Sequence, residues 1–318
     1  MTFLKKLSEI TKNDVRTCGG KGASLGEMMS AGIPVPNGFV VLTDLFQKFL
    51  KDNGLMELIL KEQLTLDLKD AQSFEQMSKT VRTAFKEKSF PEDVKTEIFT
   101  YFKEFNMQYV AVRSSATSED SSTESWAGEL ETYLNTTEEN LLENIKLCWS
   151  SLFTPRALFY AFEKNISMEH IGVAVVVQKM IASEVSGVAF TVHPVTKDHD
   201  QIVIEAGFGL GEAIVGGYIT PDNYVVQKST NAILESYISY QERKLMRDVD
   251  PNTHTAKNTW IDLSQEDGEK QKLSNEQIAN LATILKRIET HYAAPCDIEW
   301  AFAEESFVMT QCRPITTL

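Results

Sequence analysis

Lys21 lies in the glycine-rich stretch CGGKGASLGEM, residues 18–28, between Gly20 and Gly22. A run of residues compatible with a helix follows it. Backbone N–H groups at a glycine turn, a helix start and one lysine together suit the binding of phosphate oxygens. The stretch differs from a Walker A loop because Gly22 stands where that motif has Ser or Thr. The alternative interpretation is a surface turn with a solvated lysine.

Arg113 follows the strand-like part of QYVAVRSS, residues 108–115, and we expect it at the end of that strand. A long loop rich in Ser, Thr and Glu comes next. Arginine can bind a phosphate through two parallel hydrogen bonds, and nearby hydroxyl groups can orient it. A polar loop of this length inside a compact domain is more often functional than not. The alternative is a surface loop with Arg113 in a structural ion pair.

The segments DIEWAF and SFVMTQCRP, at 297–302 and 306–314, predict a β-hairpin near the C-terminal end of the sequence. A three-residue connection at 304–306 would place Asp297 opposite Arg313 and Glu299 opposite Gln311. The same register sets two apolar pairs on the other face, and a slip of one residue would exchange the faces. These two pairs are Phe302 with Val308 and Ile298 with Cys312.

One face of this hairpin therefore carries two carboxylates, an amide and a guanidinium. Asp297, Glu299 and Gln311 offer the oxygen ligands that Mg²⁺ prefers, and this cation usually bridges substrate phosphates. The alternative is an exposed strand face with two salt bridges of little energetic weight.

The run VAVVVQKM predicts a strand that ends at Gln178, Lys179 and Met180. An amide side chain and backbone groups at a strand end could read the edge of an adenine ring. The alternative is a buried strand that simply leaves the core.

The stretch EAGFGLGEAIVGGYITPDN, residues 205–223, contains five glycines directly after an apolar strand-like run. Glycine is costly to order, so such a cluster indicates tight backbone turns or the close approach of another group.

These residues must be positioned by helices in the first third of the chain and by strands later. Leu45, Phe46, Phe49 and Leu50 recur at helical spacing in 43–64, where Asp44 could cap the helix start. Residues 57–105 are charged and amphipathic, and a helical pattern covers 138–164. Strand-like runs lie at 108–115, 171–181, 186–192, 200–206 and 222–228. The pattern predicts an α+β protein.

The chain has 318 residues and a formal net charge of -14. This charge argues against binding to nucleic acid or to an acidic membrane, because both need a basic face. The N-terminal segment MTFLKKLSEI lacks the apolar core of a secretory signal, and no run reaches about 18 apolar residues. The four cysteines are far apart, which favours reduced thiols over zinc. We therefore expect a cytoplasmic protein.

Ten segments occur together and in order along the chain. They are GGKGASLGEM, GIPVPNGFVV, VAVRSSATSED, WAGELETYLN, CWSSLF, VVVQKM, SGVAFTVHP, IEAGFGLGEAIVGG, TPDNY and DIEWAF…QCRPIT. The chain resembles the N-terminal ATP-binding domain of the phosphoenolpyruvate synthase, pyruvate phosphate dikinase and rifampin phosphotransferase family. The resemblance covers nearly the whole chain and is least distinctive over 55–105.

The resemblance implies a single ATP-grasp-like domain over 1–318, with ATP in a cleft between two lobes. The lobes would be residues 1–105 with 185–318, and residues 106–184. By resemblance, Lys21 and Arg113 bind ATP phosphates, and Arg313 joins them as a catalytic cation. The resemblance also implies that Glu299 and Gln311, beside Asp297, complete the phosphate and Mg²⁺ site. Gln178, Lys179, Met180 and Ile181 match the adenine-side segment, and the glycine stretch matches a mobile loop near the cleft.

Enzymes of this family phosphorylate a histidine on a separate swivelling domain, which normally follows the QCRPIT segment. The five histidines here are His170, His193, His199, His254 and His291, and none lies in a sequence like the family's phosphohistidine motif. The resemblance thus implies a partner protein or subunit that carries the phosphohistidine domain. The segments that carry the resemblance do not extend to the family's pyruvate-binding barrel. A separate ATP-binding subunit has a precedent in phenylphosphate synthase.

Three other interpretations stay open. The chain could phosphorylate a small molecule directly, could be a non-catalytic ATP-binding regulatory module, or could be an excised piece of a longer protein. The final acceptor is not specified by the sequence, and the resemblance favours AMP plus phosphate over ADP as products.

Two departures from the family pattern are visible. Glu129 stands where the family usually has glutamine, which adds a negative charge near the expected phosphates. Cys296 and Cys312 replace neighbours that are usually polar or small. The ATP-site positions are all retained, which disfavours an inactive relative.

Overall fold

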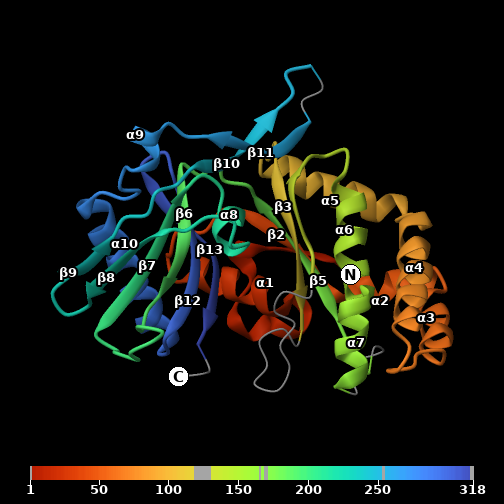
Figure 1. Ribbon diagram of the computed structural model, residues 1–318. Coiled ribbons are helices and arrows are strands. Elements are labelled where there is room, and N and C mark those ends of the chain that lie inside the picture. The colour runs from red at the N-terminus through yellow and green to blue at the C-terminus, as the bar shows by residue number, and fades with distance from the viewer. Residues whose placement is uncertain (1, 118–129, 165, 168–170, 253–254, 316–318) are drawn as a thin grey trace. The chain divides into compact units, whose positions relative to one another are not determined.

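The computed structural model describes residues 2–117, 130–164, 166–167, 171–252 and 255–315. The chain divides into two compact units, Met1–Glu27 with Asn37–Met180, and Met28–Pro36 with Ile181–Leu318. Each unit combines helices with an antiparallel sheet, so the predicted α+β class is confirmed (Figure 1).

The first unit is built on a five-stranded sheet in the order β1-β2-β5-β3-β4, in which every neighbouring pair is antiparallel. Its strands are β1 (Leu4–Lys6), β2 (Gly38–Val41), β3 (Val110–Ala116), β4 (Thr132–Thr136) and β5 (Val173–Lys179). The central strands β3 and β5 are buried along their whole length except at Lys179, because both of their faces are covered.

Helices cover one face of this sheet (Figure 1). They are α2 (Thr43–Asp52), α3 (Leu55–Gln63), α4 (Ala71–Glu87), α5 (Glu92–Glu104), α6 (Leu141–Ser150) and α7 (Pro155–Glu163), with the short turns η1 (Leu7–Glu9), η2 (Lys12–Asp14) and η3 (Ser151–Phe153). Alternate strand residues such as Val110, Val112 and Val175 join Phe46, Phe85 and the other apolar side chains of these helices in one core. Alternation along a strand leaves the next residues for the opposite face.

Helix α1 (Val15–Ser30) lies on that opposite face. A Cβ atom built on Gly22 would lie 3.3 Å from a methyl group of Val40 and 3.7 Å from a methyl group of Val176. The helical turn that contains Lys21 and Gly22 therefore packs against β2 and β5. Gln178 lies on β5, and Arg113 lies on β3 opposite Val176 of β5.

The units differ from the lobes that the resemblance implies. Residues 37–105 belong with β3 and β5 rather than with 185–318. The physical reason is the shared core: α2, α4 and α5 bury Phe46, Phe85 and Ile98 in the same apolar cluster as Val112 and Val177.

The second unit is built on a six-stranded sheet in the order β13-β12-β6-β7-β8-β9. Its strands are β6 (Val185–Phe190), β7 (Gln201–Phe208), β8 (Asp222–Gln227), β9 (Ile233–Tyr237), β12 (Cys296–Ala303) and β13 (Ser306–Pro314). Helix α10 (Asn275–Tyr292) contacts β12 and buries Ile278, Leu281, Ala282, Leu285 and Ile288. Ser274 and Gln277 form its capping box.

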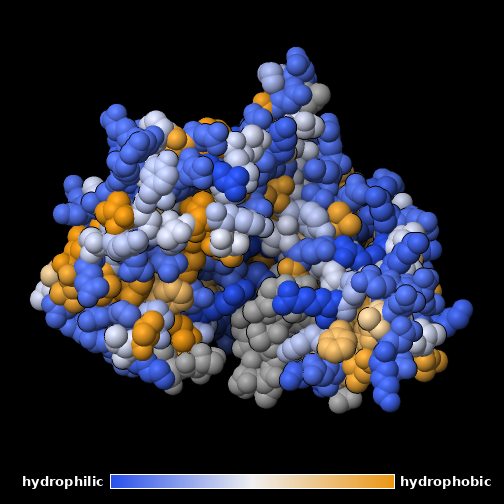
Figure 2. Space-filling view, in the orientation of Figure 1, coloured by the Kyte–Doolittle hydropathy of each residue, from blue (hydrophilic) through white to orange (hydrophobic). Residues whose placement is uncertain are grey.

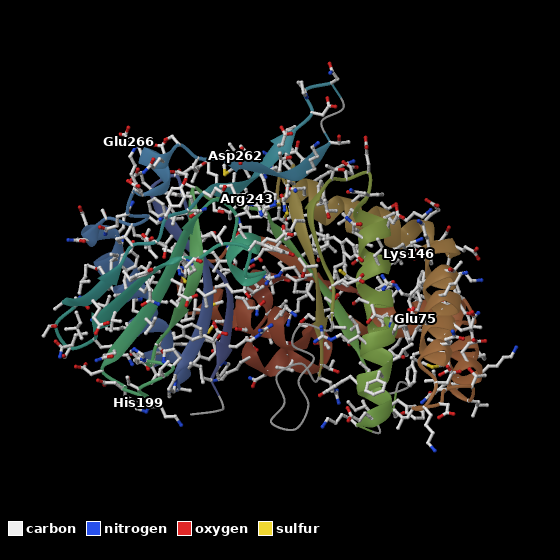
Figure 3. All side chains as sticks on the ribbon, viewed as in Figure 1. Glu75, Lys146, His199, Arg243, Asp262 and Glu266 are labelled. Atoms are coloured by element: carbon white, nitrogen blue, oxygen red, sulfur yellow. The ribbon has the colours of Figure 1, made fainter. Side chains whose placement is uncertain are left out.

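A separate two-stranded ribbon belongs to the same unit, formed by β10 (Arg243–Val249) and β11 (Ala256–Asp262). The short helices α8 (Glu212–Val215) and α9 (Gln265–Gly268) precede and follow it in the chain. Arg243 and Asp262 lie directly opposite each other at the base of the ribbon (Figure 3). The outer end of the ribbon carries mostly hydrophilic side chains (Figure 2).

The strand patterns predicted from the sequence are confirmed as β3, β5, β6, β7 and β8, with ends shifted by a few residues. The four apolar residues at helical spacing are buried on α2, but Asp44 does not cap it. The N-cap is Leu42, with no side-chain hydrogen bond, and Asp44 lies in the first turn. All four cysteines are buried free thiols. Across the described ranges, no helix is long and apolar enough to cross a membrane.

Candidate functional site

The predicted glycine turn at Lys21 is a break inside α1. Gly19 has φ 69° and ψ 173°, so the helix stops there and resumes at Gly20. A Cβ atom on Gly19 would lie 2.2 Å from the carbonyl oxygen of Ser115, which only glycine avoids. Lys21 therefore occupies the second residue of a new helical segment, as the phosphate-cradle interpretation requires.

Strand β3 holds the side chain of Lys21. Lys21 Nζ donates a hydrogen bond of 3.0 Å to the backbone carbonyl oxygen of Ser114. The contact joins residues that are 93 positions apart. The side chain of Lys21 thus bonds to β3, the strand that contains Arg113. Two residues that bind the same phosphates need to lie close together in this way.

Arg113 lies in the middle of β3, not at the strand end that the sequence suggests. Its side chain is 9% exposed, and Nη1 donates to Oε1 of Gln178 on β5 at 3.4 Å. Arg113 faces Val176 across the strands, and Gln178 is two residues further along β5. The guanidinium and the amide therefore share one face of the sheet.

Gln178 carries a buried donor without a partner. The residue is 2% exposed, and its Nε2 atom has no hydrogen-bond partner in the part of the chain described. A buried amide N–H without an acceptor costs free energy, so such a group in a native fold needs an explanation. A ligand oxygen or ring nitrogen next to Arg113 would satisfy it.

The strand end at Lys179 and Met180 is where the sequence predicts it, but its backbone amides are used. Lys179 N donates to Asn37 O at 2.8 Å, and Met180 N donates to Tyr109 O at 3.0 Å. The adenine-side prediction therefore cannot depend on these two N–H groups. Ile181, the last residue of that prediction, is counted with the second unit.

The β12–β13 hairpin has the predicted polar register. Asp297 pairs with Arg313, Ile298 with Cys312 and Glu299 with Gln311. The predicted pairing of Phe302 with Val308 is wrong, because Phe302 pairs with Phe307.

A bulge and a shorter turn cause the difference. Ala303 pairs with Ser306, so the connection has two residues, Glu304 and Glu305, both at positive φ. The register then shifts next to Glu299, which leaves Thr310 as the extra residue. Phe307 consequently packs on the rings of Trp300 and Phe302, while Gln311 stays on the acid face.

The acid face extends beyond the hairpin. Across the sheet, Glu299 pairs with Val188 on β6, and Val188 pairs with Glu205 on β7. Glu205 thus lies in the same row as Glu299 and Gln311. No local sequence pattern marks Glu205, because the row exists only once three strands are in register.

Burial and like charge raise two carboxyl pKa values on this face. The pKa of Asp297 is raised above its ordinary value of 3.8 by burial and then by Glu299, while Arg313 opposes the shift. The pKa of Glu205 is raised above 4.5 by burial and then by Asp297. Oδ1 of Asp297 is buried and has no hydrogen-bond partner in the described residues. A hard cation bound by these oxygens would reduce the repulsion between the carboxylates.

The described part of the chain contains no cluster of three or more His, Cys, Asp and Glu side chains already arranged as metal ligands. The predicted ligand set of Asp297, Glu299 and Gln311 includes an amide and only two carboxylates. It stays a prediction, supported by the register and by the unsatisfied Asp297 oxygen.

The glycine stretch at 205–223 is closely packed against β10. Gly209 has φ +92° and bridges to Leu245, whose carbonyl oxygen would lie 2.4 Å from a Cβ atom on that glycine. Leu210 N also donates to Leu245 O at 2.8 Å. The group that approaches at Gly209 is thus the backbone of β10.

The ribbon makes further contacts with this stretch. Asn258 on β11 donates to Glu212 on α8, and Trp260 meets the ring of Tyr218 edge-on at 6.2 Å. The guanidinium of Arg243 lies 4.3 Å from the centre of the Trp260 ring.

Three histidines lie within the described residues. His193 Nδ1 accepts backbone N–H bonds from Val195 and Thr196, both at 3.2 Å, so it closes a turn. His199 is exposed near the start of β7 (Figure 3), and His291 packs edge-on against Tyr292. His170, His254, Glu129 and the polar loop at 118–129 lie outside the described residues.

Comparison with known proteins gives a family match over most of the chain. Residues 15–318 match the family described as pyruvate phosphate dikinase, AMP/ATP-binding domain. A probable phosphoenolpyruvate synthase from Methanocaldococcus jannaschii is 41% identical over 100% of this chain and 27% of the relative. One from Archaeoglobus fulgidus is 42% identical over 98% of this chain and 41% of the relative. The chain thus spans less than half the length of these curated relatives.

A D-alanine–D-alanine ligase from Helicobacter pylori is a distant structural neighbour. It has 15% identity and a TM-score of 0.30, and covers 71% of this chain and 47% of its own. A likeness at this level carries no argument about the fold.

Proposed function

Because the chain belongs to the family of pyruvate phosphate dikinase AMP/ATP-binding domains, we propose that it binds Mg·ATP and transfers a phosphoryl group from it. The acceptor in this proposal is a histidine on a separate partner domain. The observation that carries the proposal is the buried pair of Arg113 on β3 and Gln178 on β5, with its unsatisfied amide donor; β3 also holds the side chain of Lys21.

Lys21 and Arg113 supply the positive charge in the first unit. Phosphoryl transfer depends mainly on positioning and on neutralising the charge of the phosphate oxygens. Arg113 donates a hydrogen bond to the amide oxygen of Gln178, which helps to position its guanidinium. Lys21 is held near a carbonyl oxygen that it can exchange for a phosphate oxygen. Both residues would bind phosphate oxygens in the bound state.

Glu299, Gln311 and Asp297 would hold Mg²⁺ in the second unit, with Arg313 as a further cation. A bound Mg²⁺ would offset the repulsion that raises the pKa values of Asp297 and Glu205. The metal would supply charge neutralisation for the phosphate oxygens. Arg313 lies opposite Asp297 and would orient that carboxylate.

A histidine elsewhere is proposed as the acceptor because no histidine of this chain lies in a sequence like the family's phosphohistidine motif. In addition, Nδ1 of His193 accepts two backbone N–H groups, so phosphorylation at that nitrogen would open the turn. In the proposed transfer, an imidazole nitrogen of the partner forms a bond to phosphorus as the bond to the nucleotide oxygen breaks. Lys21, Arg113 and Arg313 would stabilise the charge on the departing oxygens.

The test is a mixing experiment with ATP labelled in the β- or the γ-phosphate. The chain is incubated alone, and then with a protein that carries a phosphohistidine domain of this family. The proposal predicts acid-labile label on the partner, lost in Arg313→Ala and retained in Lys197→Ala, a control at an exposed loop lysine. ATP bound but never consumed would instead favour a binding module, and label on a small molecule would favour a direct kinase.

A further inference from the structure

The break in α1 leaves polar backbone groups that need partners. The first helical segment ends at Cys18, whose carbonyl oxygen is no longer bonded along a continuous helix. The second segment starts at Gly20, so Gly22 is its third residue. In most helices the side chain before the first residue accepts the third N–H group. Gly19 holds that position and has no side chain.

The hydroxyl group of Ser115 fills this role from another strand. Its Oγ accepts a hydrogen bond from Gly22 N at 3.2 Å and donates one to Cys18 O at 2.9 Å. One hydroxyl thus bonds both ends of the break. Ser115 is fully buried, and a Cβ atom on Gly19 would lie 2.2 Å from its Oγ. This close approach of β3 therefore requires glycine at position 19.

Lys21 lies between the two bonded groups. With Cys18 and Gly22 both tied to Ser115, the backbone of Lys21 is fixed at both sides. We propose that Ser115 is a positioning residue for Lys21, which holds the break in α1 so that the lysine can meet a phosphate oxygen. The inference rests on the proposed function, since it assigns the phosphate contact to Lys21.

Ser114 offers a matched control because its hydroxyl points elsewhere. Ser114 Oγ donates to Glu131 O at 2.8 Å and to Cys148 O at 3.2 Å, and it lies 3.3 Å from Ser151 Oγ. Only its backbone carbonyl contacts Lys21. Ser114→Ala therefore removes a buried hydroxyl from the same strand without touching the cap of the broken helix.

The experiment is a double-mutant cycle on Mg·ATP affinity, measured by calorimetry on the full chain. Ser115→Ala is expected to weaken binding about fivefold, if the stability that a serine cap usually contributes is the cost of holding Lys21 in its binding position. Lys21→Ala should weaken it more, and adding Ser115→Ala to Lys21→Ala should change nothing further. Ser114→Ala should leave the affinity within twofold of wild type, although it lowers the melting temperature.

The possible outcomes distinguish the role proposed for Ser115 from the binding of phosphate by Lys21. An unchanged affinity in Lys21→Ala, or no binding by the wild type, contradicts the proposed function. A clear loss in Lys21→Ala with equal and additive losses in Ser115→Ala and Ser114→Ala contradicts the inference alone. If Ser115→Ala does not fold, Ser115→Cys takes its place in the cycle, because its thiol weakens both bonds and nearly keeps the volume.

Discussion

Arg113 Nη1 and Gln178 Oε1 lie 3.4 Å apart, both buried, on neighbouring strands of the first unit. Only one of the two polar atoms of the Gln178 amide is hydrogen-bonded: Oε1 accepts from Arg113, while Nε2 has no partner among the described residues. Buried amides that only stabilise a fold are normally bonded at both atoms. Gln241, also 2% exposed, is such a case: it bonds Phe208 N, Phe208 O and Arg243 O.

Gln178→Met is therefore expected to weaken Mg·ATP binding about tenfold, because Arg113 loses a charge-assisted contact and the ligand loses a donor. Its melting temperature should stay close to wild type, since the buried unsatisfied Nε2 disappears. Gln241→Met should do the opposite, with lower stability and little change in affinity. Calorimetry and thermal unfolding of both variants check this. Equal destabilisation with unchanged affinity would make Gln178 a structural residue.

Asp297→Asn is expected to raise the stability of the ligand-free chain at pH 7. A carboxyl whose folded pKa is raised contributes stability that is complete below its unfolded value and lost as the pH rises through the folded value. For Asp297 the unfolded value is near 3.8 and the folded pKa lies above it. The neutral amide escapes that loss, but it offers Mg²⁺ no charge. Tighter Mg·ATP binding in this variant would contradict the predicted metal site.

The pH dependence provides the control for Asp297→Asn. Urea unfolding of variant and wild type should differ most above the raised folded pKa. The difference should shrink as the pH falls toward 3.8, where both side chains become neutral. A difference that is independent of pH would mean that the charge of Asp297 is not the cause.

Gly209→Ala and Gly217→Ala separate close packing from backbone conformation. Both residues have positive φ, but a Cβ on Gly209 would lie 2.4 Å from Leu245 O, whereas nothing lies within 4 Å of a Cβ on Gly217. Gly217→Ala should cost about 1 kcal/mol in the free energy of unfolding. Gly209→Ala should cost at least about 3 kcal/mol, because it adds a clash with β10. Equal losses of unfolding free energy for the two variants in chemical denaturation would show that β10 can shift to accommodate the added Cβ atom.

Lys272→Met tests the buried ion pair that ties β8 to the segments around it. Lys272 Nζ lies 2.9 Å from Asp222 Oδ1, and both side chains are fully buried. Asp222 also accepts from Ser239 N and Tyr224 Oη. Leaving Asp222 charged and unpaired should cost about 3–5 kcal/mol in unfolding free energy. Lys270→Met, in an exposed pair with Asp267, should change that free energy little.

The local patterns predicted much of the fold. Short apolar runs at the start of β3 and along most of β5 marked these strands, and helical spacing marked α2. The polar register of the hairpin followed from alternation, since a slip of one residue would place Gln311 and Arg313 on the face away from Asp297 and Glu299. The turn was mispredicted because Glu304 and Glu305 adopt positive φ, a conformation that the sequence signals only through Gly, Asn or Asp.

Long-range contacts were out of reach of the sequence patterns. Ser115 appeared only as part of a motif, because its partners Cys18 and Gly22 are 97 and 93 positions away. Glu205 joins the acid face through two strand pairings that no local pattern encodes. The units differ from the implied lobes for the same reason, since α2–α5 share their core with β3 and β5.

The most direct test of the central claim is a calorimetric titration of the purified chain with Mg·ATP, beside Arg113→Ala. The proposal predicts saturable binding by the wild type at or below millimolar ATP, dependent on Mg²⁺. It also predicts a loss of at least about tenfold in Arg113→Ala, since that variant removes a charge-assisted contact to phosphate. Binding that is absent at millimolar Mg·ATP, or that is equally tight in Arg113→Ala, would contradict the proposal.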